Sequence, residues 1–285
     1  MKIDEIQKKL YYIVAKSPVG YTGKMVTRKK QERIILAYHG VAPGHPSCLS
    51  PNIFREHIAY LRKKYDIVPI NEIVNKANDH SKPKISISFD DAYINLLEHA
   101  VPILQHYEIP AIFYVPTNYL GKKNEWDSHY SLPLLQIMTV KDLQILHSKG
   151  FIIGSHTQNH ISLKGKSLKI LQQEVGKSKT ILENIIGDEI QSFAYPYGGR
   201  SNIDYQVIRI VEESEYSSAV TSYWGRFNDW NKRYELRRIT IWPSDNLAML
   251  SLKLNGYYDW LTPEEVFISV IRTILTRYIE KGGIL

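Results

Sequence analysis

Two adjacent carboxylates, Asp90 and Asp91, follow directly on the apolar run formed by residues 85–89. Neighbouring side chains of a strand point to opposite faces, so we expect the pair to do two different jobs rather than grip one ion symmetrically. A carboxylate can serve as a general base or as a metal ligand. The alternative is a helix N-cap, since aspartate is favoured where a loop enters a helix. The pair alone does not decide between these interpretations.

Two imidazoles four residues apart, His156 and His160, follow a second apolar run at residues 151–155. They can converge on one metal ion, and Asp91 would complete a set of two histidines and a carboxylate with positions left for water and substrate. Thr157 stands where zinc proteases of the His-Glu-x-x-His type carry their glutamate, so a general base must come from elsewhere. Taken alone, either histidine could be a surface residue. Zinc is the first choice of ion, although other first-row metals also suit these ligands.

A third signal is the turn Pro196-Tyr197-Gly198, which follows the apolar residues 193–195. Proline makes the turn rigid, and glycine lets the backbone approach a ligand closely. On its own this segment is only a turn. The three signals in this order, each at the end of a strand-like run, are much more specific than any one of them.

The elements that must position these residues alternate between two patterns. Strand-like apolar runs occupy residues 34–39, 85–89, 111–115, 151–155, 192–195, 216–220 and 236–242, and helical spacing occurs at residues 53–64, 93–107, 140–147 and 168–186. This alternation indicates parallel strands with crossover helices. We therefore expect an α/β fold, a distorted (β/α) barrel of about seven parallel strands in which the ends of the strands build the site.

Both ends of the chain lie outside this alternation. Residues 1–32 carry eight Lys or Arg against three Asp or Glu, a net charge of +5 out of +7, and begin with an amphipathic helix at residues 3–16. Helix signals also follow residue 262, where Thr262-Pro263 precedes an apolar stripe. The predicted organisation is a basic arm at residues 1–32, a barrel at 33–250 and a helical extension at 251–285.

Composition and charge exclude several classes of protein. The 285 residues are 44% hydrophobic and 23% charged, which is ordinary for a globular chain. A single cysteine, Cys48, excludes an intramolecular disulfide and a cysteine-based zinc site. The longest apolar run near the N-terminus, residues 10–15, is shorter than the ~7 residues of a cleaved signal, so we expect a cytoplasmic protein. Residues 1–16 could contact the inner face of a membrane, whereas no nucleic-acid-binding motif follows the arm.

From residue 33 to residue 244 the sequence resembles the polysaccharide deacetylase family, the NodB-homology group of metal-dependent sugar N-deacetylases built on a distorted barrel. The motifs above carry the resemblance, together with connecting segments such as residues 100–104 before 109–113. It implies that Asp90 is the catalytic base, that Asp91, His156 and His160 bind the metal, and that the backbone N–H of Tyr197 joins an oxyanion site beside Pro196.

The sequence departs from the family pattern at three places. The glycine usual after the aspartate pair is Ala92, a mild change. The arginine usual two residues before the proline is Ala194, so a guanidinium that steadies the base must come from another strand. Arg238 is the candidate, and we expect it to contact the substrate as well. The C-terminal Leu-His motif that supplies the acid in many members is missing; Trp242 and Pro243 lie near where it would be expected.

Tyr38-His39 offers a replacement for that acid. This segment looks like the strand of the circularly permuted branch of the family, in which the acid histidine begins the barrel, and the alternative is a buried structural histidine. Trp126 is the aromatic residue we expect against a sugar ring, and further flat faces are offered by Tyr130, Tyr195, Trp224 and Trp230.

The expected function is hydrolysis of an N-acetyl group on an amino sugar of a glycan or glycan precursor, with one divalent ion, Asp90 as base and His39 as acid. Two other classes remain as alternatives. One is a non-catalytic carbohydrate-binding barrel derived from the same family. The other is a non-haem iron oxygenase, which also uses two histidines and a carboxylate, although the alternation of strands and helices argues against it.

Overall fold

The computed structural model describes the whole chain except residues 1, 18–19, 21–31, 74–81, 131 and 262–285. The chain divides into two compact units, one made of residues 1–30 and 251–285 and the other of residues 31–250. The predicted helix after Thr262-Pro263 and the second half of the basic arm lie outside the described residues.

The larger unit is a closed barrel of seven parallel strands. Going round the ring, the strands are β1 (Arg33–Tyr38), β10 (Leu236–Thr240), β9 (Ser218–Trp224), β8 (Ser192–Ala194), β7 (Ile152–Ser155), β6 (Ala111–Val115) and β5 (Lys84–Phe89). β1 closes the ring because it pairs with β10 on one side and with β5 on the other. The predicted distorted barrel and all seven predicted strands are confirmed.

Three strands of two residues each were not predicted, since so short a run shows no alternation. β4 (Asp66–Ile67) pairs with the start of β5, while β2 (Gly40–Val41) and β3 (Cys48–Leu49) form a separate sheet just after β1.

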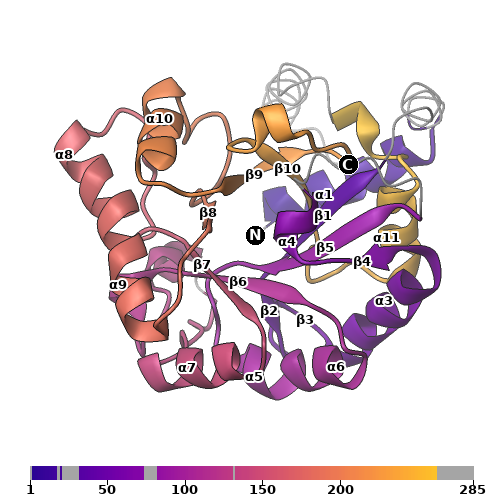
Figure 1. The fold of residues 1–285 in the computed structure, drawn as a ribbon. Coiled ribbons are helices and arrows are strands. Elements are labelled where there is room, and N and C mark those ends of the chain that lie inside the picture. The colour runs from indigo at the N-terminus through magenta and orange to yellow at the C-terminus, as the bar shows by residue number, and fades with distance from the viewer. Residues whose placement is uncertain (1, 18–19, 21–31, 74–81, 131, 262–285) are drawn as a thin grey trace. The chain divides into compact units, whose positions relative to one another are not determined.

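The crossover helices lie outside the strands (Figure 1). They are α3 (Pro51–Lys64), α5 (Asn95–His99), α6 (Val101–His106), α7 (Val140–Ser148), α8 (Leu168–Leu171), α9 (Ser178–Ile186) and α10 (Tyr205–Glu213). Short 3₁₀-helices are η1 (Thr117–Tyr119), η2 (Glu125–Tyr130), η4 (Trp230–Lys232) and η5 (Asp259–Leu261). The predicted helix at 93–107 is two helices, because Pro102 lacks the N–H that would continue the first one.

Side-chain caps fix where several of these helices begin. The Ser50 hydroxyl accepts a hydrogen bond from the Ile53 N–H at the start of α3, and Thr139 and Asp142 form a reciprocal capping box at the start of α7. The first helix after β8, α10, begins at the cap Asp204.

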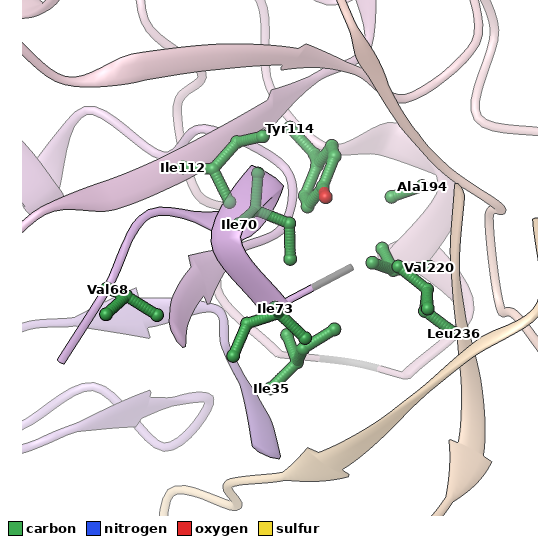
Figure 2. Packing of buried hydrophobic residues seen from close by; sticks show 9 residues of the cluster. All are labelled: Ile35, Val68, Ile70, Ile73, Ile112, Tyr114, Ala194, Val220 and Leu236. Carbon is green, nitrogen blue, oxygen red and sulfur yellow. The ribbon is translucent and has the colours of Figure 1, made fainter. Parts of the chain in front are cut away.

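The interior of the barrel is filled by side chains rather than open. Nine buried residues form one cluster, in which inward-facing side chains of five strands meet those of the short helix α4 (Ile70–Ile73), as Figure 2 shows. Ile70 and Ile73 pack against Ile35 of β1 and the other members, namely Val68, Ile112, Tyr114, Ala194, Val220 and Leu236. The packed interior leaves the opposite strand ends as the place for a site.

The smaller unit contains α1 (Lys2–Ala15) and the end of α11 (Leu247–Leu254). In it the ring of Tyr11 meets that of Trp260 edge to face, with 5.4 Å between centroids. None of the helices in the described part of the chain combines the length and apolar content needed to cross a bilayer. The membrane contact and the cytoplasmic location stay predictions.

Candidate active site

All the predicted site residues except Pro196 meet at the ends of the strands around a cavity of about 440 Å³. β5 delivers Asp90 and Asp91, and β7 delivers the segment that contains His156 and His160. β1 is in register with β5, so that His39 lies level with Asp90, whose N–H donates to the Tyr38 carbonyl at 3.0 Å. The cavity is lined by His39, Asp90, Asp91, His156, His160 and Tyr197, among others.

Asp91, His156 and His160 offer three buried ligand atoms that all lie within 4.8 Å of one another. Asp91 Oδ1 is 3.6 Å from Nε2 of His156 and 3.3 Å from Nε2 of His160. Burial lowers the pKa of His156 to about 4 and that of His160 to about 3, so both rings are neutral at pH 7. Neutral imidazole is the form that binds metals.

The hydrogen bonds around these groups fit a divalent cation. His156 Nδ1 donates to the Ala194 carbonyl at 2.7 Å, which leaves the lone pair on Nε2 facing Asp91. Among the residues that the structure describes, the buried atoms Asp91 Oδ1 and His160 Nδ1 find no hydrogen-bond partner. A buried carboxylate oxygen with no donor is costly, and a bound cation would remove that cost.

Asp90 is held by a buried guanidinium. Nη1 and Nη2 of Arg238 each donate to a different oxygen of Asp90 at 2.7 Å, and Nε donates to the Thr221 carbonyl at 2.8 Å. Burial on its own would raise the pKa of Asp90, but Arg238 holds it well below its usual range. Arg238, on β10, therefore lies where it can orient the carboxylate of Asp90, the predicted base. Arg238 also lines the cavity, where its predicted contact with substrate stays a prediction.

His39 is half-buried at the end of β1 and lines the same cavity. It lies near both carboxyls: burial raises the pKa of Asp91 and the nearby His39 opposes that rise, while Arg238 is the main cause of the low pKa of Asp90 and His39 adds to it. The structure therefore brings the predicted acid to the predicted base. Its role, and membership of the permuted branch, stay predictions.

The turn after β8 brings only one of its two predicted residues to the cavity. Tyr197 has a φ of 60° and an exposed ring 5.0 Å from that of His160, whereas Pro196 is buried and is not among the lining residues. Gly198 has a φ of 58°, and a Cβ there would meet Oγ of Ser222 at 2.4 Å. Glycine is required because β9 runs so close to the turn.

Trp126 lies against the proposed metal site. Its ring stacks on the imidazole of His160 with centroids 4.1 Å apart and meets Tyr119 edge to face. Trp126 thus orients His160, and its predicted sugar contact stays a prediction. Of the other aromatic residues, Tyr130 lines the cavity and is exposed, but Tyr195, Trp224 and Trp230 are not among the lining residues.

A network of polar side chains behind Asp91 was not predicted. Tyr93 lies close enough to Asp91 to oppose the rise in pKa that burial causes in that carboxyl, and Nδ2 of the buried Asn124 donates to the Tyr93 hydroxyl at 3.2 Å and to Asp127 at 2.8 Å. Tyr93 and Asp127 also line the cavity. Tyr93 follows the aspartate pair closely enough to have been suspected, whereas no pattern in the sequence marks Asn124 or Asp127.

Backbone conformation at the site is unusual. Asp91, Ala92, Thr157, His160 and Tyr197 all have positive φ without being glycine. Each such residue costs on the order of 1 kcal/mol, and strain of this kind gathers at functional sites. Ala92, with a φ of 47°, occupies the position where the resemblance predicts glycine.

Comparison with known proteins adds a family and a fold. The family model of polysaccharide deacetylase matches residues 77–218. The Bacillus subtilis protein YxkH is 24% identical over 221 residues, which cover 76% of this chain and 74% of that protein. A poly-beta-1,6-N-acetyl-D-glucosamine N-deacetylase of Staphylococcus epidermidis is 28% identical over 158 residues, 51% of this chain. The chain spans only about half, 52%, of this staphylococcal relative.

Among solved structures, IcaB from Ammonifex degensii superposes with a TM-score of 0.67 at 20% identity, covering 82% of this chain and 98% of that one. The Streptococcus pyogenes deacetylase PplD in complex with acetate gives 0.66 at 22% identity, covering 78% and 97%. At these identities the superpositions establish a shared fold.

Proposed function

Because this chain belongs to the polysaccharide deacetylase family, we propose that it hydrolyses the N-acetyl group of an amino sugar within a glycan or glycan precursor. One observation supports this most directly. A carboxylate held by a buried arginine lies beside a neutral His, His, carboxylate cluster at one cavity. Activity as a poly-β-1,6-N-acetylglucosamine N-deacetylase in staphylococcal relatives makes such a polymer the first substrate to test.

Asp91, His156 and His160 would hold one divalent ion, and zinc is the first choice for such ligands. When bound, the ion supplies a Lewis acid for the acetamide carbonyl and makes water more acidic. Burial keeps both imidazoles in the neutral, ligating form.

The remaining steps belong to the chain's own residues. Asp90 accepts a proton from the attacking water, and Arg238 keeps that carboxylate deprotonated and aimed. The backbone N–H of Tyr197 donates to the oxygen that gains charge as the carbonyl carbon becomes tetrahedral. His39 protonates the amine as the C–N bond breaks, so that water is consumed and acetate and a free amino sugar are released.

A non-catalytic sugar-binding barrel is the alternative that this site disfavours. A binding protein has no use for a carboxylate held deprotonated in a buried pair, because burying two charges is expensive unless they serve a purpose. Every side chain to which this proposal assigns a role lines the same cavity, which supports the proposal.

The test is release of acetate from β-1,6-linked N-acetylglucosamine oligomers, from chitin oligomers and from free N-acetylglucosamine, with chelator and then with added zinc. Asp90→Asn should keep zinc and lose about 100-fold or more in turnover, the usual contribution of a general base. The matched control is Asp188→Asn, which changes an exposed aspartate in the loop between α9 and β8. Zinc-loaded wild type that releases no acetate from any of the three, or Asp90→Asn that turns over normally, would contradict the proposal.

A further inference from the structure

Glu174 is a buried acid that the proposed mechanism does not use. It is 4% exposed and accepts three hydrogen bonds from the segment that carries the two histidines. Its Oε2 accepts the N–H groups of Gln158 at 3.0 Å and of Asn159 at 2.9 Å, and its Oε1 accepts Nδ2 of Asn159 at 2.6 Å. One side chain therefore binds both residues that immediately precede His160.

The segment from His156 to His160 needs such support because its backbone is strained. Thr157 has a φ of 67° and His160 a φ of 49°. The segment is also held by η1: the N–H of Thr117 donates to the Thr157 carbonyl at 3.1 Å. Asn118 contributes two bonds, N–H to the Gln158 carbonyl at 2.9 Å and Nδ2 to Oδ1 of Asn159 at 2.8 Å. Strain persists only where the surroundings over-determine it.

The helix that presents Glu174 departs from α-geometry at this point. Between α8 and α9 runs a π-helical segment, η3 (Gln172–Lys177), and Glu174 lies within it. π-Helical segments inside α-helices occur frequently at functional sites. Here the irregular segment holds the carboxylate against the histidine segment.

We propose that Glu174 is a positioning residue that sets the distance and orientation between His156 and His160, and through them the affinity for the metal. This inference rests on the proposed metal site. Groups that orient ligands are typically worth about 10- to 100-fold in metal affinity. Glu174 acts from outside the cavity, so its effect reaches the metal only through the backbone of residues 157–160.

The geometry of the contact permits a test by hydrogen-bond reversal. In Glu174→Gln the amide oxygen can still accept both backbone N–H groups, but the amide nitrogen then faces Nδ2 of Asn159, donor against donor. In Asn159→Asp two carboxylates face each other at the same contact. In the double variant, the carboxylate introduced at position 159 accepts from the amide introduced at position 174 and from Asn118, so that every hydrogen bond is restored with unchanged total charge.

Two quantities are measured on the full chain: the Kd for zinc, by competition with a chromophoric chelator, and hydrogen exchange of the Gln158 and Asn159 amides in zinc-free protein. Each single variant should weaken zinc binding about 10- to 100-fold and expose both amides to exchange, and the double variant should recover most of both losses. The control is Glu183→Gln on α9, a glutamate that also accepts a backbone N–H, from Ile190 at 3.3 Å, but lies away from the histidines. It should leave zinc affinity unchanged.

Unchanged zinc affinity in Glu174→Gln, or a double variant no better than either single one, would overturn the inference. If a single variant does not fold, the double variant still decides, because it must then bind zinc nearly as well as wild type. Failure of the proposed function is recognised separately, since it leaves zinc-loaded wild type unable to release acetate.

Discussion

Replacing Arg238 with methionine should lower the free energy of unfolding of the barrel. The loss should be larger at pH 7 than at pH 4. The side chain is 1% exposed, and its two donors at 2.7 Å are the charge partners of the buried Asp90. Methionine keeps much of the volume but leaves the carboxylate of Asp90 buried without a cation.

The magnitude follows from the burial of both partners. Removing one partner of a buried ion pair typically costs about 3–5 kcal/mol because an uncompensated charge stays behind. For a unit of this size, 1 kcal/mol corresponds to about 2–4 °C in Tm, so a loss of about 6–20 °C is expected. Arg233→Met is the matched control: Arg233 forms a more exposed pair with Glu212 at 3.2 Å, and such surface pairs contribute about 0–1 kcal/mol.

The dependence on pH comes from the carboxyl of Asp90. In wild type its folded pKa lies below the unfolded value of about 3.9, so its stabilisation is complete above that value and is lost as the pH falls through the folded pKa. Without the arginine, burial dominates and raises the folded pKa above the unfolded one. The variant's deficit should therefore be largest at pH 7 and shrink toward pH 4, where Asp90 takes up a proton.

Urea unfolding of metal-free wild type, Arg238→Met and Arg233→Met at pH 7, 5.5 and 4 measures this directly. Equal stability of the two arginine variants at pH 7 would refute the argument that the buried pair is what matters. A deficit that grows toward acid pH would refute the assigned direction of the pKa change. Arg238→Lys keeps the charge but cannot form the bidentate contact. Its free energy of unfolding should therefore lie between those of wild type and Arg238→Met.

Two further predictions concern His39 and Ala92. If His39 protonates the leaving amine, His39→Ala should retain zinc and lose amide hydrolysis far more than hydrolysis of an aryl acetate, whose phenolate leaves without a proton; equal losses on the two substrates would place the acid elsewhere. Ala92→Gly should raise Tm by up to a few degrees, because glycine relieves the positive φ of 47° at a cost in unfolded-chain entropy of about 0.4–1 kcal/mol; a lower Tm with normal zinc binding would show that the Ala92 methyl group contributes more by packing than its φ costs.

The barrel could be predicted from the sequence because its strands are buried on both faces and separated by regular helices. Such strands read as continuous apolar runs, and all seven were found within a few residues of their observed ends. The helix α10 was missed although its apolar positions, Val207, Ile210 and Val211, have helical spacing. Only residues 200–204 separate it from the glycine-rich turn after β8, and this short connection hides where the helix begins.

The candidate site could be predicted only as far as local motifs reach. Asp90 and Asp91 lie in one motif and His156 and His160 in another, and strand order brings the two together. The contacts of Glu174 and Asn124 were out of reach, because both residues act through backbone geometry, a π-helical segment in one case and a long loop in the other. In the sequence, a glutamate on the polar face of a predicted helix has the pattern of a solvent-exposed residue. Nothing in that pattern marks where the helix becomes π-helical.

The pairing of β1 with β10, which closes the ring, determines when the proposed site can form during synthesis of the chain. β1 is the first strand of the barrel to leave the ribosome and β10 the last, and Arg238 follows Asp90 by 148 residues. Until β10 docks, β1 has an unpaired edge and Asp90 lacks its cation, so burying that carboxylate is unfavourable. Contacts between such distant parts of a chain form late and slowly. The same docking event therefore closes the sheet and pairs the proposed base with its arginine, so a nascent chain that stops before β10 should carry both proposed metal-binding motifs but not the complete proposed site.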